Sequence, residues 1–179
     1  MSLPGRAVTS AAALLIVLVG CGDSPASPTA DGQPGGFELT AARVTAADGE
    51  VCELCLWLAD SPDRRRQGLI GVTDLGPADG MAFRFDTPSQ SAFHMRGAPM
   101  PLSIAFFSDG AFVGALDMPP CMNAPENACP AHATGEPFTD ALEVPMGELD
   151  AHGIGPGSRL EVLAQPCPET SSEVSAATT

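Results

Sequence analysis

Side chains suited to binding chemistry gather in one stretch of the chain, between residues 93 and 122. They are His94, Met95, Arg96, Met100, Met118, Cys121 and Met122. Imidazole and sulfur ligands suit soft metals such as copper, so one hypothesis is a copper-binding protein. Methionine also fills gaps in protein cores, and a single histidine is usually held by structural contacts. We therefore expect no metal and no other cofactor.

The sequence supports catalysis less well. Asp117 and Glu143 could act as an acid and base pair in glycan hydrolysis, but an acidic chain contains many such pairs. The chain has no Gly-x-Ser-x-Gly motif, no His-x-x-x-His motif and no lysine for Schiff-base chemistry. An envelope hydrolase acting on glycans or esters remains an alternative, and we assign no catalytic residue.

The charge balance excludes another class of partner. The 179 residues carry 22 acidic and 8 basic side chains, which gives a formal net charge of -14. Proteins that bind nucleic acid need a basic face, so we expect no nucleic-acid partner.

The N-terminus resembles that of a bacterial lipoprotein. Arg6 precedes a short apolar stretch at 11–19, which is the length of a signal-peptide core and too short to span a bilayer. The sequence Leu18-Val19-Gly20-Cys21 is similar to a lipobox, in which the cysteine receives diacylglycerol. We therefore expect a signal peptide at 1–20 and an extracytoplasmic protein of the cell envelope, held on a membrane by a lipid on Cys21.

Composition divides the remaining chain into three parts. Residues 21–36 are rich in Pro, Gly and Ser and predict a flexible tether. Residues 37–167 contain the apolar segments and predict a single folded domain, whereas residues 168–179 predict a disordered tail. We expect this protein to be a monomer.

Within the domain, apolar residues mostly alternate with polar ones, which is the pattern of half-buried strands. The expected strands cover 51–59, 81–86, 92–96, 102–107, 111–116, 138–144 and 159–164. Asp109-Gly110 predicts a tight hairpin, and 118–137 predicts a long irregular loop. The fold class is therefore all-β, either a compact β-sandwich of jelly-roll type or a partly closed barrel, with one or two short helices.

A helix of two turns at most is expected after the first of these strands. Ser61 can cap it, Pro62 suits its first position and Gly68 can end it. The three consecutive arginines at 64–66 could bind an anion, but a solvated helix face is the simpler interpretation.

Five cysteines remain once Cys21 is set aside for the lipid. Cys52 and Cys55 point to opposite faces of a strand and cannot join each other. Cys121 and Cys129 lie close enough in the long loop to form a disulfide. Cys167 is expected to pair with Cys52 or Cys55, which leaves one free thiol.

The order of several short motifs resembles the domain of unknown function family 192. They are Ala59-Asp60-Ser61-Pro62, Gly68-Leu69, Gly80-Met81-Ala82-Phe83, Met95-Arg96, Pro101-Leu102, Ile104-Ala105-Phe106, Ala141-Leu142-Glu143-Val144, Gly147, Gly153-Ile154 and Gly157. The resemblance implies a compact β-sandwich without an established activity, and a disulfide between similar Pro-Cys and Cys-Pro pairs. The chain departs from it where the family usually has Trp, Asn-Thr and Asp, and this chain has His94, Gly97-Ala98 and Ser103.

These observations favour a non-catalytic binding or accessory module at the envelope. The expected binding face consists of His94, Arg96, Met100 and Pro101, with Glu143 nearby. The loop that contains Cys121 and Cys129 lies beside this face. Its partner would be a small molecule, a glycan or an envelope protein.

Overall fold

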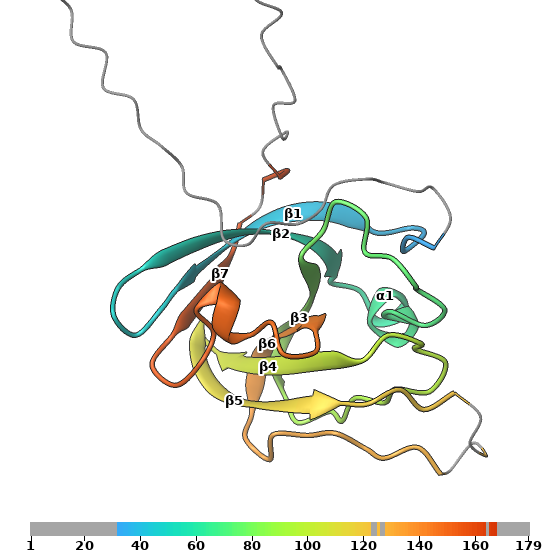
Figure 1. Ribbon diagram of the computed structural model, residues 1–179. Coiled ribbons are helices and arrows are strands. Elements are labelled where there is room, and N and C mark those ends of the chain that lie inside the picture. The colour runs from blue at the N-terminus through green and yellow to red at the C-terminus, as the bar shows by residue number, and fades with distance from the viewer. Residues whose placement is uncertain (1–31, 123–124, 126–127, 164, 168–179) are drawn as a thin grey trace, which may run out of the picture.

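The protein is built mainly from β-strands. The computed structural model describes residues 32–122, 125, 128–163 and 165–167. Figure 1 shows the elements, which are β1 (Glu38–Thr45), β2 (Val51–Ala59), α1 (Pro62–Gln67), β3 (Gly80–Ser89), β4 (Leu102–Ser108), β5 (Ala111–Met118), β6 (Phe138–Pro145), the 3-10 turn η1 (Asp150–His152) and β7 (Arg159–Val162). This confirms the all-β fold class with short helical turns.

The strands form a ring in the order β1-β2-β3-β6-β4-β5-β7, and β7 also pairs with β1. Neighbouring strands are antiparallel except β2 and β3, which run parallel and are joined by a crossover that contains α1. The pairing between β5 and β7 is the shortest in the ring, because only Ala111 and Arg159 are paired there. A partly closed barrel therefore describes the sheet best.

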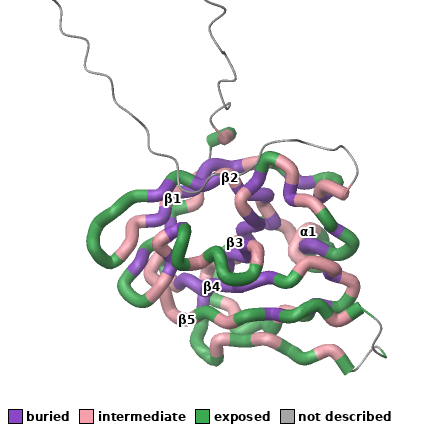
Figure 2. Tube along the Cα trace, viewed as in Figure 1, coloured by how far each residue is buried: buried purple, intermediate pink, exposed green. Residues whose placement is uncertain are grey.

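Both faces of the sheet are buried in its central strands. One apolar cluster, which we call the inner core, draws on Val44, Leu54, Phe107, Leu142 and other residues all around the ring. The second, the outer core, lies on the opposite face under α1 and the segments 68–79 and 90–101. Figure 2 shows buried residues along β2, β3 and β4.

The sequence predicted several elements closely. The strand at 51–59 and the helix after Ser61 are present, and the Asp109-Gly110 hairpin joins β4 to β5. Both hairpin residues have positive φ, 47° and 77°, as a two-residue turn of this kind requires.

Two predictions about strands were wrong. Residues 92–96 form no strand, because their partner is the irregular loop 119–137, and only the isolated pairs Phe93 with His132 and Arg96 with Cys121 result. In addition, β1 was not predicted, because Ala41 and Ala42 are both buried and the alternation is therefore weak.

Several expectations fall on other parts of the chain. The signal peptide at 1–20, Cys21, most of the tether and the tail at 168–179 lie outside the described residues. The end of the expected tether touches the domain, since the Gly35 and Gly36 carbonyls accept hydrogen bonds from Gln67 and Arg64. None of the described helices is long and apolar enough to cross a membrane.

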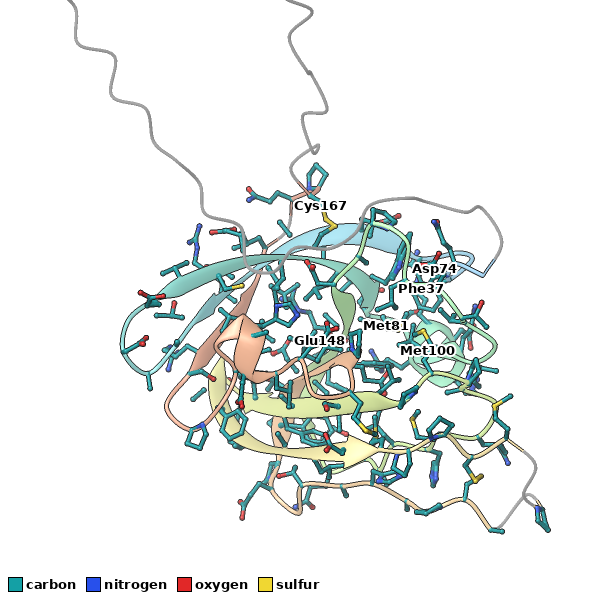
Figure 3. All side chains as sticks on the ribbon, in the orientation of Figure 1. Phe37, Asp74, Met81, Met100, Glu148 and Cys167 are labelled. Atoms are coloured by element: carbon teal, nitrogen blue, oxygen red, sulfur yellow. A yellow bond between two sulfur atoms is a disulfide. The ribbon has the colours of Figure 1, made fainter. Side chains whose placement is uncertain are left out.

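Two disulfides are formed between described residues. Cys121 is joined to Cys129, and Cys55 is joined to Cys167 (Figure 3). The second bridge can form because the chain after β7 continues along β1, where the backbone of Ala41 forms hydrogen bonds with Leu163 and Gln165. None of the described cysteines is free, so the expectation of a free thiol among them was wrong. Disulfides persist in oxidising compartments, which indicates an extracytoplasmic protein.

The two bridges should differ in their contribution to stability. They close loops with sequence separations of 112 and 8 residues. Chain entropy then predicts that Cys55→Ser/Cys167→Ser lowers the free energy of unfolding by about 5 kcal/mol, and Cys121→Ser/Cys129→Ser by about 2.5 kcal/mol. Urea unfolding of the two double variants measures this order, and equal or reversed losses would contradict it.

Candidate functional site

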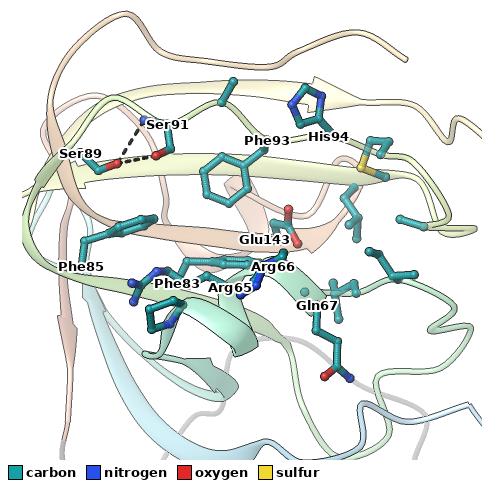
Figure 4. Close-up of a pocket in the computed structure, with 18 of the residues that line it drawn as sticks. Arg65, Arg66, Gln67, Phe83, Phe85, Ser89, Ser91, Phe93, His94 and Glu143 are labelled. Carbon is teal, nitrogen blue, oxygen red and sulfur yellow. Dashed lines mark hydrogen bonds between the residues drawn. The ribbon is translucent and has the colours of Figure 1, made fainter. Parts of the chain in front are cut away.

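A pocket of about 710 Å³ opens on the outer face of the sheet, between α1, β3 and the segment that follows β3. Figure 4 shows this pocket and the side chains that point towards it. The charged and aromatic side chains that line it include Arg65, Arg66, Phe83, Phe85, Phe93, His94, Arg96 and Glu143. They come from four parts of the chain that the fold brings together.

The helix α1 supplies one rim of the pocket. Ser61 caps its N-terminus by accepting the Arg64 backbone N–H at 3.3 Å, Pro62 occupies its first turn, and Gly68 ends it with φ of 47°.

A second glycine, Gly80 at the start of β3, allows two strands below the pocket to lie close together. A side chain there would meet the Glu143 carbonyl oxygen at 2.1 Å, so glycine allows β3 to approach β6.

The arginines of α1 differ in their partners. Arg64 pairs with Asp60 at 3.1 Å and Arg66 pairs with Asp63, which fits the expected solvated face. Arg65 instead donates to the carbonyls of Asp60 and Arg84 and lies 4.6 Å from the centre of the Phe85 ring. No described carboxylate is within ion-pair distance of Arg65. Its charge at the pocket is therefore not neutralised by an acidic neighbour.

Phenylalanine rings form the wall of the pocket. Phe83 and Phe93 meet edge to face with ring centres 5.0 Å apart, and Phe93 also contacts Phe106 at 5.7 Å. The phenylalanines of the outer core thus hold the 90–101 segment in place although it forms no strand. Both rings belong to segments that were expected to be strands, 81–86 and 92–96, and the alternation of those segments does not indicate a pocket.

Glu143 forms the floor. It lies on β6 opposite Met81 of β3 and Ile104 of β4, and only 5% of the residue is exposed. Figure 4 shows its carboxyl group beside the Phe83 and Phe93 rings. No described group forms a hydrogen bond or ion pair with this carboxyl. Burial raises the pKa of Glu143 to about 8, so the carboxyl is protonated at neutral pH.

The expected binding residues are divided by the structure. His94, Arg96 and Glu143 line the pocket, and Arg96 pairs with Cys121, which places the loop closed by Cys121 and Cys129 beside it. Met100 packs against the outer core instead, and neither Met100 nor Pro101 lines the pocket.

The residues of the other hypotheses lie elsewhere. Met95 and Met118 are 1% and 0% exposed and belong to the outer core, and Cys121 is in a disulfide. The described part of the chain contains no group of three His, Cys, Asp or Glu residues that could hold a metal. Asp117 accepts a hydrogen bond from Ser103 and does not line the pocket.

The positions that depart from the family pattern have different surroundings. His94 and Ala98 line the pocket, so these two departures alter its surface. Ser103 is buried away from it, where its hydroxyl donates to Asp117 and accepts the Gly147 N–H at 3.0 Å. Ser103 thus joins β4 to β5 and to the turn after β6.

The family model for DUF192, described as "Uncharacterized ACR", matches residues 43–162. The chain belongs to the DUF192 family. The matched region contains every element except the start of β1, so the pocket lies within the DUF192 domain.

Two solved structures are similar to this DUF192 protein. A Sinorhizobium meliloti 1021 protein, named as a proposed transcription regulator, is 26% identical with a TM-score of 0.61, and the match covers 72% of this chain and 97% of that one. A protein of unknown function from Novosphingobium aromaticivorans DSM 12444 is also 26% identical, with a TM-score of 0.57 and coverage of 71% and 87%. No curated protein matches the sequence.

The raised pKa of Glu143 predicts a specific dependence of stability on pH. Between pH 4.5 and about 8 the folded protein keeps a proton that the unfolded chain releases, so the free energy of unfolding falls as the pH rises through this window. The shift corresponds to at most about 5 kcal/mol. Glu143→Gln cannot ionise and should therefore be stabilised relative to the wild type at pH 8.5 but not at pH 4.

Urea unfolding at the two pH values measures this difference. Glu136→Gln changes an exposed glutamate and serves as the control, which should follow the wild type. An identical pH dependence in the wild type and Glu143→Gln would show that Glu143 ionises normally.

Proposed function

We propose that this DUF192 protein is an extracytoplasmic, lipid-anchored binding module that holds a small molecule in the pocket above Glu143. The observation that carries the proposal is the buried carboxyl of Glu143 on the pocket floor, without a hydrogen-bond partner among the described residues. The Glu143 oxygens are not among the fully buried atoms that lack a partner, so they are reached from the pocket, and a polar group of a ligand bound there would satisfy them in place of water.

The pocket also has the composition of a ligand site. Its volume falls within the range of small-molecule sites, its wall is aromatic, and a few polar groups converge on it. The structure does not assemble the predicted catalytic pair, because the paired carboxylates of a glycosidase flank one bond, whereas Asp117 does not line the pocket of Glu143.

A role in transcription, as proposed for the Sinorhizobium meliloti protein, fits this chain poorly. The net charge of -14 opposes DNA binding, and the disulfides favour an oxidising compartment.

The binding role is tested by filling the pocket. Ala92 lines it and Ala131 is exposed elsewhere, so Ala92→Trp and Ala131→Trp form a matched pair. In a thermal-shift screen of small molecules, compounds that stabilise the wild type should also stabilise Ala131→Trp and lose their effect on Ala92→Trp.

Stabilisation that persists in Ala92→Trp would place the ligand elsewhere. Turnover of a glycan or ester by the wild type, abolished by Glu143→Gln, would replace the binding role with catalysis.

The anchor is supported by the sequence around Cys21, which is similar to a lipobox. A diacylglycerol on Cys21 would hold the protein at the membrane surface. Cys21→Ser should therefore abolish incorporation of a labelled fatty acid and release the protein from the membrane fraction. Undiminished labelling of Cys21→Ser would exclude this anchor.

A further inference from the structure

One basic and one acidic side chain at the pocket have no partner of opposite charge among the described residues. The guanidinium of Arg65 at the rim has no carboxylate partner, although it is held in place by two backbone carbonyls and the Phe85 ring. The carboxyl of Glu143 on the floor has no hydrogen-bond partner among the described residues and is open to the pocket. Phe83 and Phe93 lie between the floor and the opening (Figure 4).

Glu143 and Arg65 each favour a different functional group on a ligand. A carboxylate beside the faces of aromatic rings is the composition that binds an organic ammonium ion, through charge attraction and cation-π contacts. An arginine without an acidic partner binds a carboxylate or phosphate. A ligand with only one charge would leave the other group of the pocket unsatisfied.

We propose that the pocket binds a zwitterionic small molecule, with its ammonium group at Glu143 against the Phe83 and Phe93 rings and its carboxylate or phosphate at Arg65. This inference rests on the proposed binding function and names the ligand class for the same site. The acidic surface does not oppose such a ligand, because its net charge is zero.

Ammonium binding is coupled to proton release. Burial raises the pKa of Glu143 to about 8, so at pH 7 the carboxyl loses its proton when the ammonium binds. The other charged or titratable groups at the pocket are Arg65 and Arg66 of α1, Asp86 of β3, and His94 and Arg96 of the 90–101 segment. β4 contributes only Leu102. Affinity should rise by about tenfold per pH unit up to about pH 8 and then level off.

Matched probes of different charge test the inference on the full-length protein. Calorimetry would compare 6-aminohexanoate, hexylamine, hexanoate and hexanol, and the series from 4-aminobutanoate to 8-aminooctanoate would vary the separation of the charges. The best zwitterion should bind at least about tenfold more tightly than either singly charged probe. The binding heats in Tris and in phosphate buffer should differ by the difference between the ionisation enthalpies of the two buffers, for about one proton released per ligand bound.

Two variants assign the contacts. Glu143→Gln should weaken zwitterion and hexylamine binding by at least about tenfold and remove the proton release, whereas Arg65→Gln should reduce zwitterion affinity to that of hexylamine. Glu136→Gln and Arg43→Gln, which lie outside the pocket, are the charge-matched controls.

Other outcomes overturn the inference. Unchanged zwitterion binding by Glu143→Gln would show that the ammonium group does not depend on a negative charge at this position. Binding of hexanol and hexanoate that Ala92→Trp abolishes, with no gain from an ammonium group, would reject the zwitterion and retain the pocket as a binding site. Failure of every probe to bind would reject the zwitterion, and only the small-molecule screen would then test the binding function.

Discussion

Burial of the central sheet on both faces is the constraint on which the other features depend. In an ordinary half-exposed sheet, every second side chain of a strand faces water. Here Ala141, Leu142, Glu143 and Val144 of β6 are all buried, since the inner core lies on one face and the outer core on the other. The carboxyl group of Glu143, in the middle of this buried stretch, is therefore placed in an apolar environment, and the protein holds it there in its neutral form.

The segments that cover the outer face of the sheet determine where the pocket lies. The crossover between the parallel strands β2 and β3 carries α1, and Trp57 of β2 holds the rest of that crossover by donating to the Leu75 carbonyl at 2.9 Å. The segment 90–101 and the loop 119–137 cover the neighbouring area through the Phe93 ring and the Cys121–Cys129 disulfide. The pocket lies where these covers leave a gap above Glu143, so its shape depends on loops held by a few strong contacts.

Much of the fold could be predicted from the sequence because its signals are local. Alternation identified β2, the two-residue turn signal identified the β4–β5 hairpin, and the cap residues identified α1. β1 was missed because its buried residues are small, and residues 92–96 were misassigned because alternation does not reveal whether a partner strand exists. The site was predicted in part: His94, Arg96 and Glu143 do share a pocket, whereas Met100 and Pro101 do not line it. The role of Arg65 depends in part on the Arg84 carbonyl, which lies on another element and which no local pattern encodes.

The central claim is that Glu143 is a buried carboxyl that remains neutral at physiological pH and forms the floor of a binding pocket. The most direct measurement is the carboxyl carbon chemical shift of Glu143, followed by NMR as a function of pH in the protein without ligand. The account predicts a titration midpoint near the pKa of about 8. A midpoint close to the ordinary glutamate value of about 4.3 would contradict it, because the carboxyl would then be solvated or paired.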